Sequence, residues 1–271
     1  MLAIPALLLL LCAYVALPRL YRALLERRLL RLCRRHRLVA ITFDDGPGSQ
    51  LTPLVLDRLA AAGVPATFFV LGRATIGHED LVTRMQVDGH EVGSHGEDHV
   101  DHLRTAPWRC VRDTARGLDH VQRLLHTGAR EIAFRPPHGH LNLVSLVHAW
   151  LRRTPIACWT HDGFDTRLWV DVPPALTARA LRDSGGGVML LHDFDRTIPN
   201  PTARVLARLD AILALRHEGF RFVRFADLRH VSRGGALPPL PAPAPVAEPA
   251  RDHEWPAGAP QRRRRSVRAP R

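Results

Sequence analysis

Short apolar runs alternate with helical patterns between residues 38 and 232. The runs that predict buried strands are LVAITF (38–43), 66–72, 91–95, 132–137, 155–162, 187–193 and 220–225. Between them, apolar residues recur at helical spacing over 51–62, 79–88, 105–126, 142–152, 173–183 and 201–216. Such alternation of strands and helices predicts a parallel sheet with right-handed crossovers, either a barrel or a doubly wound sheet.

The first 17 residues are apolar and carry no charge. At ~1.5 Å per residue, a helix of this length is near the lower limit for crossing a bilayer. Because no basic residue precedes the segment and no small-residue cleavage site follows it, we expect an uncleaved anchor rather than a removed signal. Residues 18–37 then alternate leucine at helical spacing with arginine, which predicts a basic juxtamembrane helix on an anionic surface.

The positive charge is concentrated in the two ends of the chain. Residues 18–37 hold eight arginines and one acid, and residues 233–271 hold eight arginines and three acids. Residues 38–232, the expected catalytic domain, are neutral, with 22 arginines and 22 acids. The high pI therefore does not indicate a nucleic-acid partner. The C-terminal segment 233–271 is rich in proline and arginine and has few large apolar residues, so we expect a disordered tail.

Ionisable residues gather where the predicted strands end. They come from five separate segments: Asp44, Asp45, His95, His99, Arg135, Asp162, His192 and Asp193. The carboxyl ends of parallel strands share one edge of a sheet, and active sites of α/β barrels form there. The polar residues are therefore expected to meet in one site.

Asp45, His95 and His99 form a plausible metal-binding set. Three protein ligands with one open position are typical of a catalytic zinc site. His95 and His99 are spaced i, i+4, so one helical turn would present both on one side. The adjacent Asp44 adds a second carboxylate, and two desolvated carboxylates need a cation or hydrogen bonds to compensate them.

Five motifs in order carry a family resemblance. They are TFDDGP (42–47), SHGEDH (94–99), RPPHG (135–139), WTHDGFD (159–165) and LLHD (190–193). Together they resemble the polysaccharide deacetylases of the NodB-homology type, carbohydrate esterase family 4, over approximately residues 38–228. The resemblance implies a deformed (β/α) barrel of about seven strands, here preceded by an N-terminal hydrophobic helix. It also implies metal-dependent hydrolysis of acetyl groups from amino sugars.

The resemblance implies a role for each motif residue. Asp45, His95 and His99 would hold a divalent metal, with Zn²⁺ as the expected ion. Asp44 would be the catalytic base and His192 the general acid. Arg135 would orient Asp44, and Asp162 would assist in that network.

Three positions depart from the family pattern. Gly96 stands where serine or threonine is usual, His138 where an aromatic residue is usual, and Thr166 where tryptophan is common. None of the three is a proposed ligand, acid or base. They therefore bear on the substrate more than on the chemistry.

The expected substrate is an N-acetylated glycan or glycolipid. O-acetyl ester hydrolysis, deformylation of a lipid-linked sugar, and a non-catalytic glycan-binding role are the alternatives; the complete set of site residues argues against the last. A single N-terminal anchor would place the chain at the cytoplasmic membrane. The arginines of 18–37 favour a cytoplasmic catalytic domain, whereas family members commonly act outside.

Overall fold

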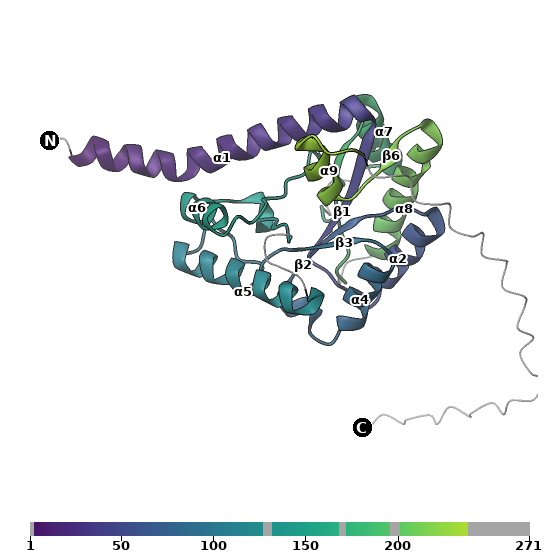
Figure 1. The fold of residues 1–271 in the computed structure, drawn as a ribbon, viewed down its shortest axis with the longest axis horizontal. Coiled ribbons are helices and arrows are strands. Elements are labelled where there is room, and N and C mark those ends of the chain that lie inside the picture. Colours follow the sequence, from purple (N-terminus) through teal and green to yellow (C-terminus); the bar gives the residue numbers. More distant parts are fainter. Residues whose placement is uncertain (1–2, 127–131, 168–171, 196–200, 238–271) are drawn as a thin grey trace, which may run out of the picture.

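The computed structural model describes residues 3–126, 132–167, 172–195 and 201–237, with side chains from residue 13 onward. Its centre is a six-stranded parallel sheet in the order β3-β2-β1-β5-β4, with β6 paired to β1 (Figure 1). The strands are β1 (Leu38–Asp44), β2 (Thr67–Val70), β3 (Glu91–Ser94), β4 (His161–Asp162), β5 (Gly187–His192) and β6 (Arg221–Phe222). The predicted α/β class is confirmed.

Isolated bridges carry the sheet around from β3 towards β4, which gives it the curvature of a deformed barrel. Phe134 bridges Ser94 on one side and Ile156 on the other, and β4 then pairs with β5. Of the predicted strand 132–137, only Phe134 is thus left as a bridging residue. The last residues of the predicted strand are Pro136 and Pro137, which have no N–H to donate to a ladder.

Helices surround the sheet (Figure 1). They are α2 (Leu51–Ala62), α3 (Gly72–Thr75), α4 (Glu79–Val87), α5 (Pro107–Leu125), α6 (Leu143–Leu151), α7 (Pro174–Ser184), α8 (Pro201–Leu213) and α9 (Phe225–Ser232), with 3-10 turns at Pro137–Gly139 and Ala214–Glu218. The helical patterns predicted six of the α-helices closely. Helix α9 replaces the end of the predicted strand 220–225, because Arg224 and Asp227 form a capping box that starts a helix there.

Strand β1 lies in the middle of the sheet, and every residue of it is buried. Its neighbours β2 and β5 cover both edges, so its side chains form the centre of the core, as a continuous apolar run predicts. The register with β5 places Asp44 directly beside His192. The sheet therefore brings the first and fifth motifs together at its carboxyl edge.

The N-terminal segment forms one continuous helix, α1 (Ala3–His36), which runs from the apolar residues into the arginine-rich ones (Figure 1). Within residues 18–37, Leu29 and Cys33 are buried, and Leu25 and Leu32 pack against the core. Leu20 and Leu24 of the same part are 57% and 49% exposed, so the folded domain covers the apolar residues of this part only from Leu25 onward.

The prediction of a transmembrane anchor is wrong. Within the described part of the chain, no helix combines the length and the apolar character that crossing a bilayer requires. The uncharged stretch is only marginally long enough, and α1 carries arginine from Arg19 onward. The placement at the cytoplasmic membrane through a single N-terminal anchor, which depended on that prediction, is wrong with it. The predicted C-terminal tail lies outside the described residues from residue 238 onward.

Candidate metal centre and active site

The site begins where β1 ends, at Asp44 and Asp45. Asp44 is the last residue of the strand and is buried, whereas Asp45 is half-buried. Asp45 has φ = +72°, and His99 has φ = +58°. Both residues thus adopt the left-handed conformation, which residues other than glycine rarely take. Such residues are common at functional sites.

Asp45, His95 and His99 converge on one point. The Oδ1 atom of Asp45 lies 3.4 Å from Nε2 of His95 and 3.2 Å from Nε2 of His99. One ligand atom from each residue lies within 4.8 Å of the other two. Asp45 Oδ1 is buried and accepts no hydrogen bond. An orphaned carboxylate oxygen beside two imidazole nitrogens fits a divalent cation with an open coordination position.

The buried ring of His95 is held in the form that a cation needs. Its Nδ1 lies 2.7 Å from the backbone carbonyl oxygen of Arg135, so Nδ1–H donates there and Nε2 keeps its lone pair. Burial lowers the pKa of His95 to about 3. The imidazole is therefore neutral, which is the ligating form.

Arg135 is fully buried and fixes Asp44. Its Nη1 donates to Asp44 Oδ1 at 2.8 Å and to Thr42 Oγ1 at 2.7 Å. The other oxygen of Asp44, Oδ2, lies 3.7 Å from His95 Nε2 and so faces the cation set. Burial raises the pKa of the Asp44 carboxyl, and the Arg135 guanidinium opposes that rise.

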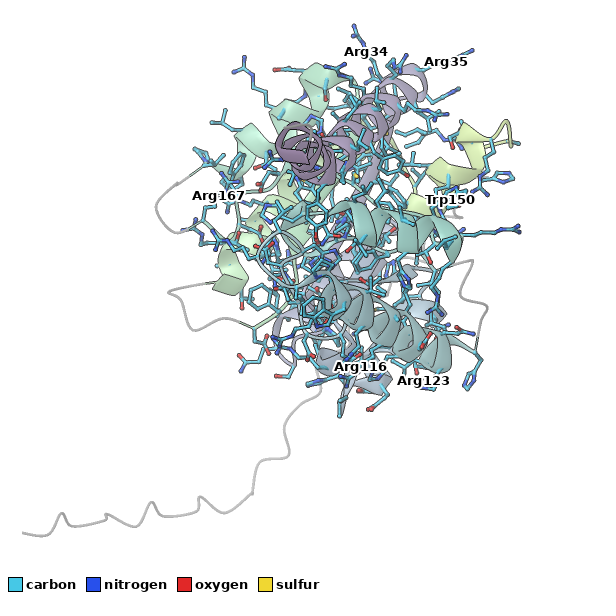
Figure 2. The ribbon with its side chains drawn as sticks, turned by 90° about the vertical axis from the view of Figure 1, so that its left-hand side faces the viewer. Arg34, Arg35, Arg116, Arg123, Trp150 and Arg167 are labelled. Atoms are coloured by element: carbon cyan, nitrogen blue, oxygen red, sulfur yellow. The ribbon has the colours of Figure 1, made fainter. Side chains whose placement is uncertain are left out.

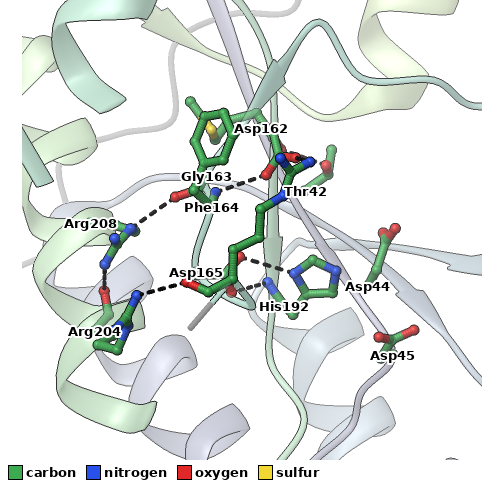
Figure 3. Close-up of polar contacts among 12 residues, drawn as sticks. Thr42, Asp44, Asp45, Asp162, Gly163, Phe164, Asp165, His192, Arg204 and Arg208 are labelled. Atoms are coloured by element: carbon green, nitrogen blue, oxygen red, sulfur yellow. Dashed lines mark hydrogen bonds and ion pairs between the residues drawn. The ribbon is translucent and has the colours of Figure 1, made fainter. Parts of the chain in front are cut away.

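His192 is paired with Asp165 (Figure 3). The Nδ1 of His192 lies 3.0 Å from Asp165 Oδ1, and the His192 backbone N–H donates to Asp165 Oδ2 at 3.0 Å. Burial by itself lowers the pKa of His192, but Asp165, together with Asp45 and Asp44, outweighs it and raises the pKa to about 9. His192 is therefore cationic at neutral pH.

Asp165, and not Asp162, contacts His192. The Asp162 carboxylate accepts hydrogen bonds from the Phe164 N–H at 2.8 Å and from Arg167 at 3.0 Å. Both aspartates lie in the fourth motif, three residues apart. The only sequence signal for Asp165 was its membership of that motif, so sequence reasoning missed its contact with His192.

Asp113 of α5 explains the departure at Gly96. Its Oδ1 accepts the backbone N–H of Asp98 at 2.7 Å, between the two ligand histidines in sequence. Gly96 has φ = +90°, and a Cβ there would collide with Asp113 Oδ2. A buried carboxylate from another helix therefore occupies the space beside this loop, and glycine is the residue that leaves room for it.

His138, the second departure, lies beside the ligand His99. The two ring centroids are 4.5 Å apart in an edge-to-face arrangement. Burial and the neighbouring His99 lower the pKa of His138, so its ring is neutral. A flat, uncharged ring thus stands where the family usually has an aromatic side chain.

Fold and site together define a class: a domain with a central parallel sheet and surrounding helices that carries, at one sheet edge, a candidate Asp–His–His cation set, an arginine-held carboxylate and a carboxylate-held histidine. The sequence model of the polysaccharide deacetylase family matches residues 31–149. A chitooligosaccharide deacetylase of Bradyrhizobium sp. (strain ANU 289) is 34% identical over 195 residues, covering 68% of this chain and 87% of that protein. The chain belongs to the polysaccharide deacetylase family, which confirms the resemblance.

Two further relatives agree. The peptidoglycan-N-acetylglucosamine deacetylase PgdA of Listeria monocytogenes serotype 1/2a (strain 10403S) is 32% identical over 197 residues, covering 72% of this chain. The matched part spans only 39% of the length of PgdA. The structure of peptidoglycan deacetylase PdaC from Bacillus subtilis superposes with a TM-score of 0.61 at 26% identity, covering 74% of this chain and 94% of that one.

Proposed function

We propose that this protein is a metal-dependent hydrolase that removes N-acetyl groups from an amino-sugar polymer or glycolipid. One observation carries the proposal: the register of β1 and β5 sets Asp44, which Arg135 holds, beside the cationic His192, next to the Asp45–His95–His99 set. Figure 3 shows Asp44, Asp45 and His192 at this edge of the sheet. Base, acid and cation ligands in one site are the parts that amide hydrolysis requires. The proposed domain limits, 38–232, remain a prediction.

The names of the relatives indicate the sugar. They describe deacetylases of peptidoglycan N-acetylglucosamine and of chitooligosaccharides. We therefore propose N-acetylglucosamine units as the substrate class of this chain as well.

Asp45, His95 and His99 would hold the cation, with Zn²⁺ as the expected ion. When bound, such an ion polarises the acetyl carbonyl and lowers the pKa of water towards ~7. Asp44 takes the proton of the attacking water on Oδ2, because Arg135 occupies Oδ1. Arg135 thus sets the direction in which the base acts.

His192 gives a proton to the departing nitrogen of the sugar. An amine leaves poorly unless it is protonated, so a cationic imidazole suits this step. Asp165 accepts the Nδ1–H of His192, which leaves Nε2–H as the proton to donate. The same carboxylate also fixes the orientation of the ring.

The proposal is tested by measuring acetate release from chitooligosaccharides. We expect release by the full chain loaded with Zn²⁺, loss of release after treatment with a chelator, and recovery when Zn²⁺ is added back. Turnover that persists in protein shown to be metal-free contradicts the proposed metal dependence. Formate release, hydrolysis of acetate esters alone, or sugar binding without turnover by the metal-loaded chain would establish one of the alternative functions instead.

The pH profile tests the roles of His192 and Asp165. Only protonated His192 can donate, so kcat is expected to fall as the pH rises through the pKa of His192, which Asp165 raises against the effect of burial. Asp165→Asn removes the neighbouring negative charge, and the alkaline limb should move down by about 1–3 pH units. Profiles of kcat for both proteins, each loaded with Zn²⁺, measure the shift. An alkaline limb at the same pH in both proteins contradicts the pairing of Asp165 with a catalytic acid.

A further inference from the structure

A groove away from the site runs between α1, α6 and α9. One part has a volume of about 790 Å³ and another about 570 Å³. The two parts share Tyr21, Pro155, Ile156 and Arg233, so they form one continuous depression. Each volume falls in the range typical of small-molecule sites. None of the proposed ligand, acid or base residues lines it.

The part of the groove beside α6 is apolar. Trp150 is 72% exposed and Leu151 is 66% exposed, and both line the groove. Tyr21 of α1 also lines this part and is 40% exposed. Large apolar side chains gathered in an exposed depression mark a binding surface more often than scattered single residues do.

The part of the groove between α1 and α9 is basic. Arg28, Arg31 and Arg35 line it from α1, and Arg229 of α9 and Arg233, directly after α9, line it from the other side. No acidic side chain is among the described lining residues. Arg229 lies 3.8 Å from Glu91, whereas for Arg28, Arg35 and Arg233 no carboxylate lies within ion-pair distance in the described parts of the chain.

Figure 2 shows Arg35 and Trp150 on the same side of the molecule, so the two parts of the groove open on one face. Guanidinium groups bind phosphate through paired, charge-assisted hydrogen bonds. An adjoining apolar surface stabilises an alkyl chain by removing it from water. A ligand complementary to both parts therefore joins a phosphate to a hydrocarbon chain.

We propose that this groove binds one molecule of a phosphorylated amphiphile, with the phosphate among the arginines and the alkyl chain over Trp150 and Leu151. Charge complementarity favours this occupant over the two that the protein itself supplies. The segment 234–271, which follows the groove-lining Arg233, has a net charge of +4, so its own arginines oppose entry into the basic part. A second copy packed symmetrically on this face would bring the same arginines with it.

Dodecyl phosphate, used below its micelle-forming concentration, tests the proposal by calorimetric titration of the full chain. We expect saturable binding with one molecule per chain. Inorganic phosphate and dodecyl maltoside, which each supply half of the ligand chemistry, should bind at least about tenfold more weakly. Equal binding of dodecyl maltoside overturns the phosphate part of the proposal, and absence of saturable dodecyl phosphate binding overturns all of it.

Matched variants locate the site. The triple change Arg28→Ala, Arg31→Ala and Arg35→Ala should weaken dodecyl phosphate binding by at least about tenfold. The control, Arg19→Ala, Arg27→Ala and Arg34→Ala, removes the same charge from arginines of α1 that do not line the groove. If the two triple variants weaken dodecyl phosphate binding equally, the net charge of the protein alone attracts the ligand, and the proposed site is wrong.

Trp150→Ala should also weaken binding, by about tenfold, whereas Trp108→Ala should not. Trp108 is 67% exposed on α5 and lies away from the groove, so it controls for loss of an exposed tryptophan. Circular dichroism of each variant shows that the fold is kept.

Two further measurements test the other occupants of the groove. If sedimentation reveals a dimer and Trp150→Ala abolishes it, the face belongs to a second copy. Protease protection of residues 238–271 that Trp150→Ala removes assigns the groove to the tail, and either result overturns the proposal.

Discussion

Asp44→Asn is expected to lower kcat for acetate release by about 10²–10⁴-fold while the cation is still bound. The asparagine amide keeps the size of the side chain and can still contact Arg135, but it cannot take a proton from water. Asp44 is not a member of the Asp45–His95–His99 set, so the ligand atoms remain in place. The measurement is kcat on chitooligosaccharides with protein whose zinc content is determined at the same time.

Asp210→Asn is the control for this change. Asp210 lies on α8, is about half exposed and pairs with Arg58 at the surface, so the same loss of charge should leave kcat unchanged. Wild-type turnover in zinc-loaded Asp44→Asn would show that another group is the base. Loss of zinc from that variant would show instead that Asp44 is required for cation binding.

His192→Ala is expected to lower kcat on the N-acetylated substrate by about 10²–10⁴-fold. The departing amine then lacks its proton donor. An activated ester such as p-nitrophenyl acetate releases a stable phenolate that needs no proton, so its hydrolysis should be affected far less. The ratio of the two rates therefore reports the loss of a general acid separately from any damage to the fold.

Zinc content and the rate on each substrate are measured for His192→Ala and for His217→Ala. His217 is exposed at the surface and should be dispensable for both reactions. An equal loss on amide and ester in zinc-loaded His192→Ala contradicts the assignment of His192 as the acid. It would point to a role of His192 in binding or in holding the site together.

The hydrophobic pattern predicted most of the order of strands and helices, but only Phe134 of the expected strand 132–137 bridges other strands, and the end of the expected strand 220–225 is helix α9. Buried parallel strands are continuous apolar runs, and the run 38–43 became β1 at the centre of the sheet. Because parallel strands end at one edge, the polar residues that follow them had to meet there. For that reason strand order predicted the proximity of Asp45, His95 and His99. The helical turn expected at 95–99 is wrong, because this segment is a loop in which His99 has φ = +58°.

The N-terminal residues show where a local pattern misleads. Apolar residues followed by arginines predict a membrane anchor when only composition is considered. In the structure, the apolar residues and the arginine-rich residues form one helix, α1. Leu29 and Cys33 in its arginine-rich part are buried. Which residues of a helix are covered by the folded domain depends on what the rest of the chain places beside them, and the local sequence does not contain that information.

By itself, the sequence determined the α/β class and the family, and it placed Asp45, His95 and His99 together as a candidate cation set, because these depend on periodicity, motif order and the shared edge of parallel strands. The tertiary structure decided which aspartate reaches His192. After β4 the chain passes through Phe164 with φ = +53°, and Asp165 rather than Asp162 then contacts the imidazole. Two aspartates three residues apart have the same chemistry, and only the path of the backbone between them separates their roles.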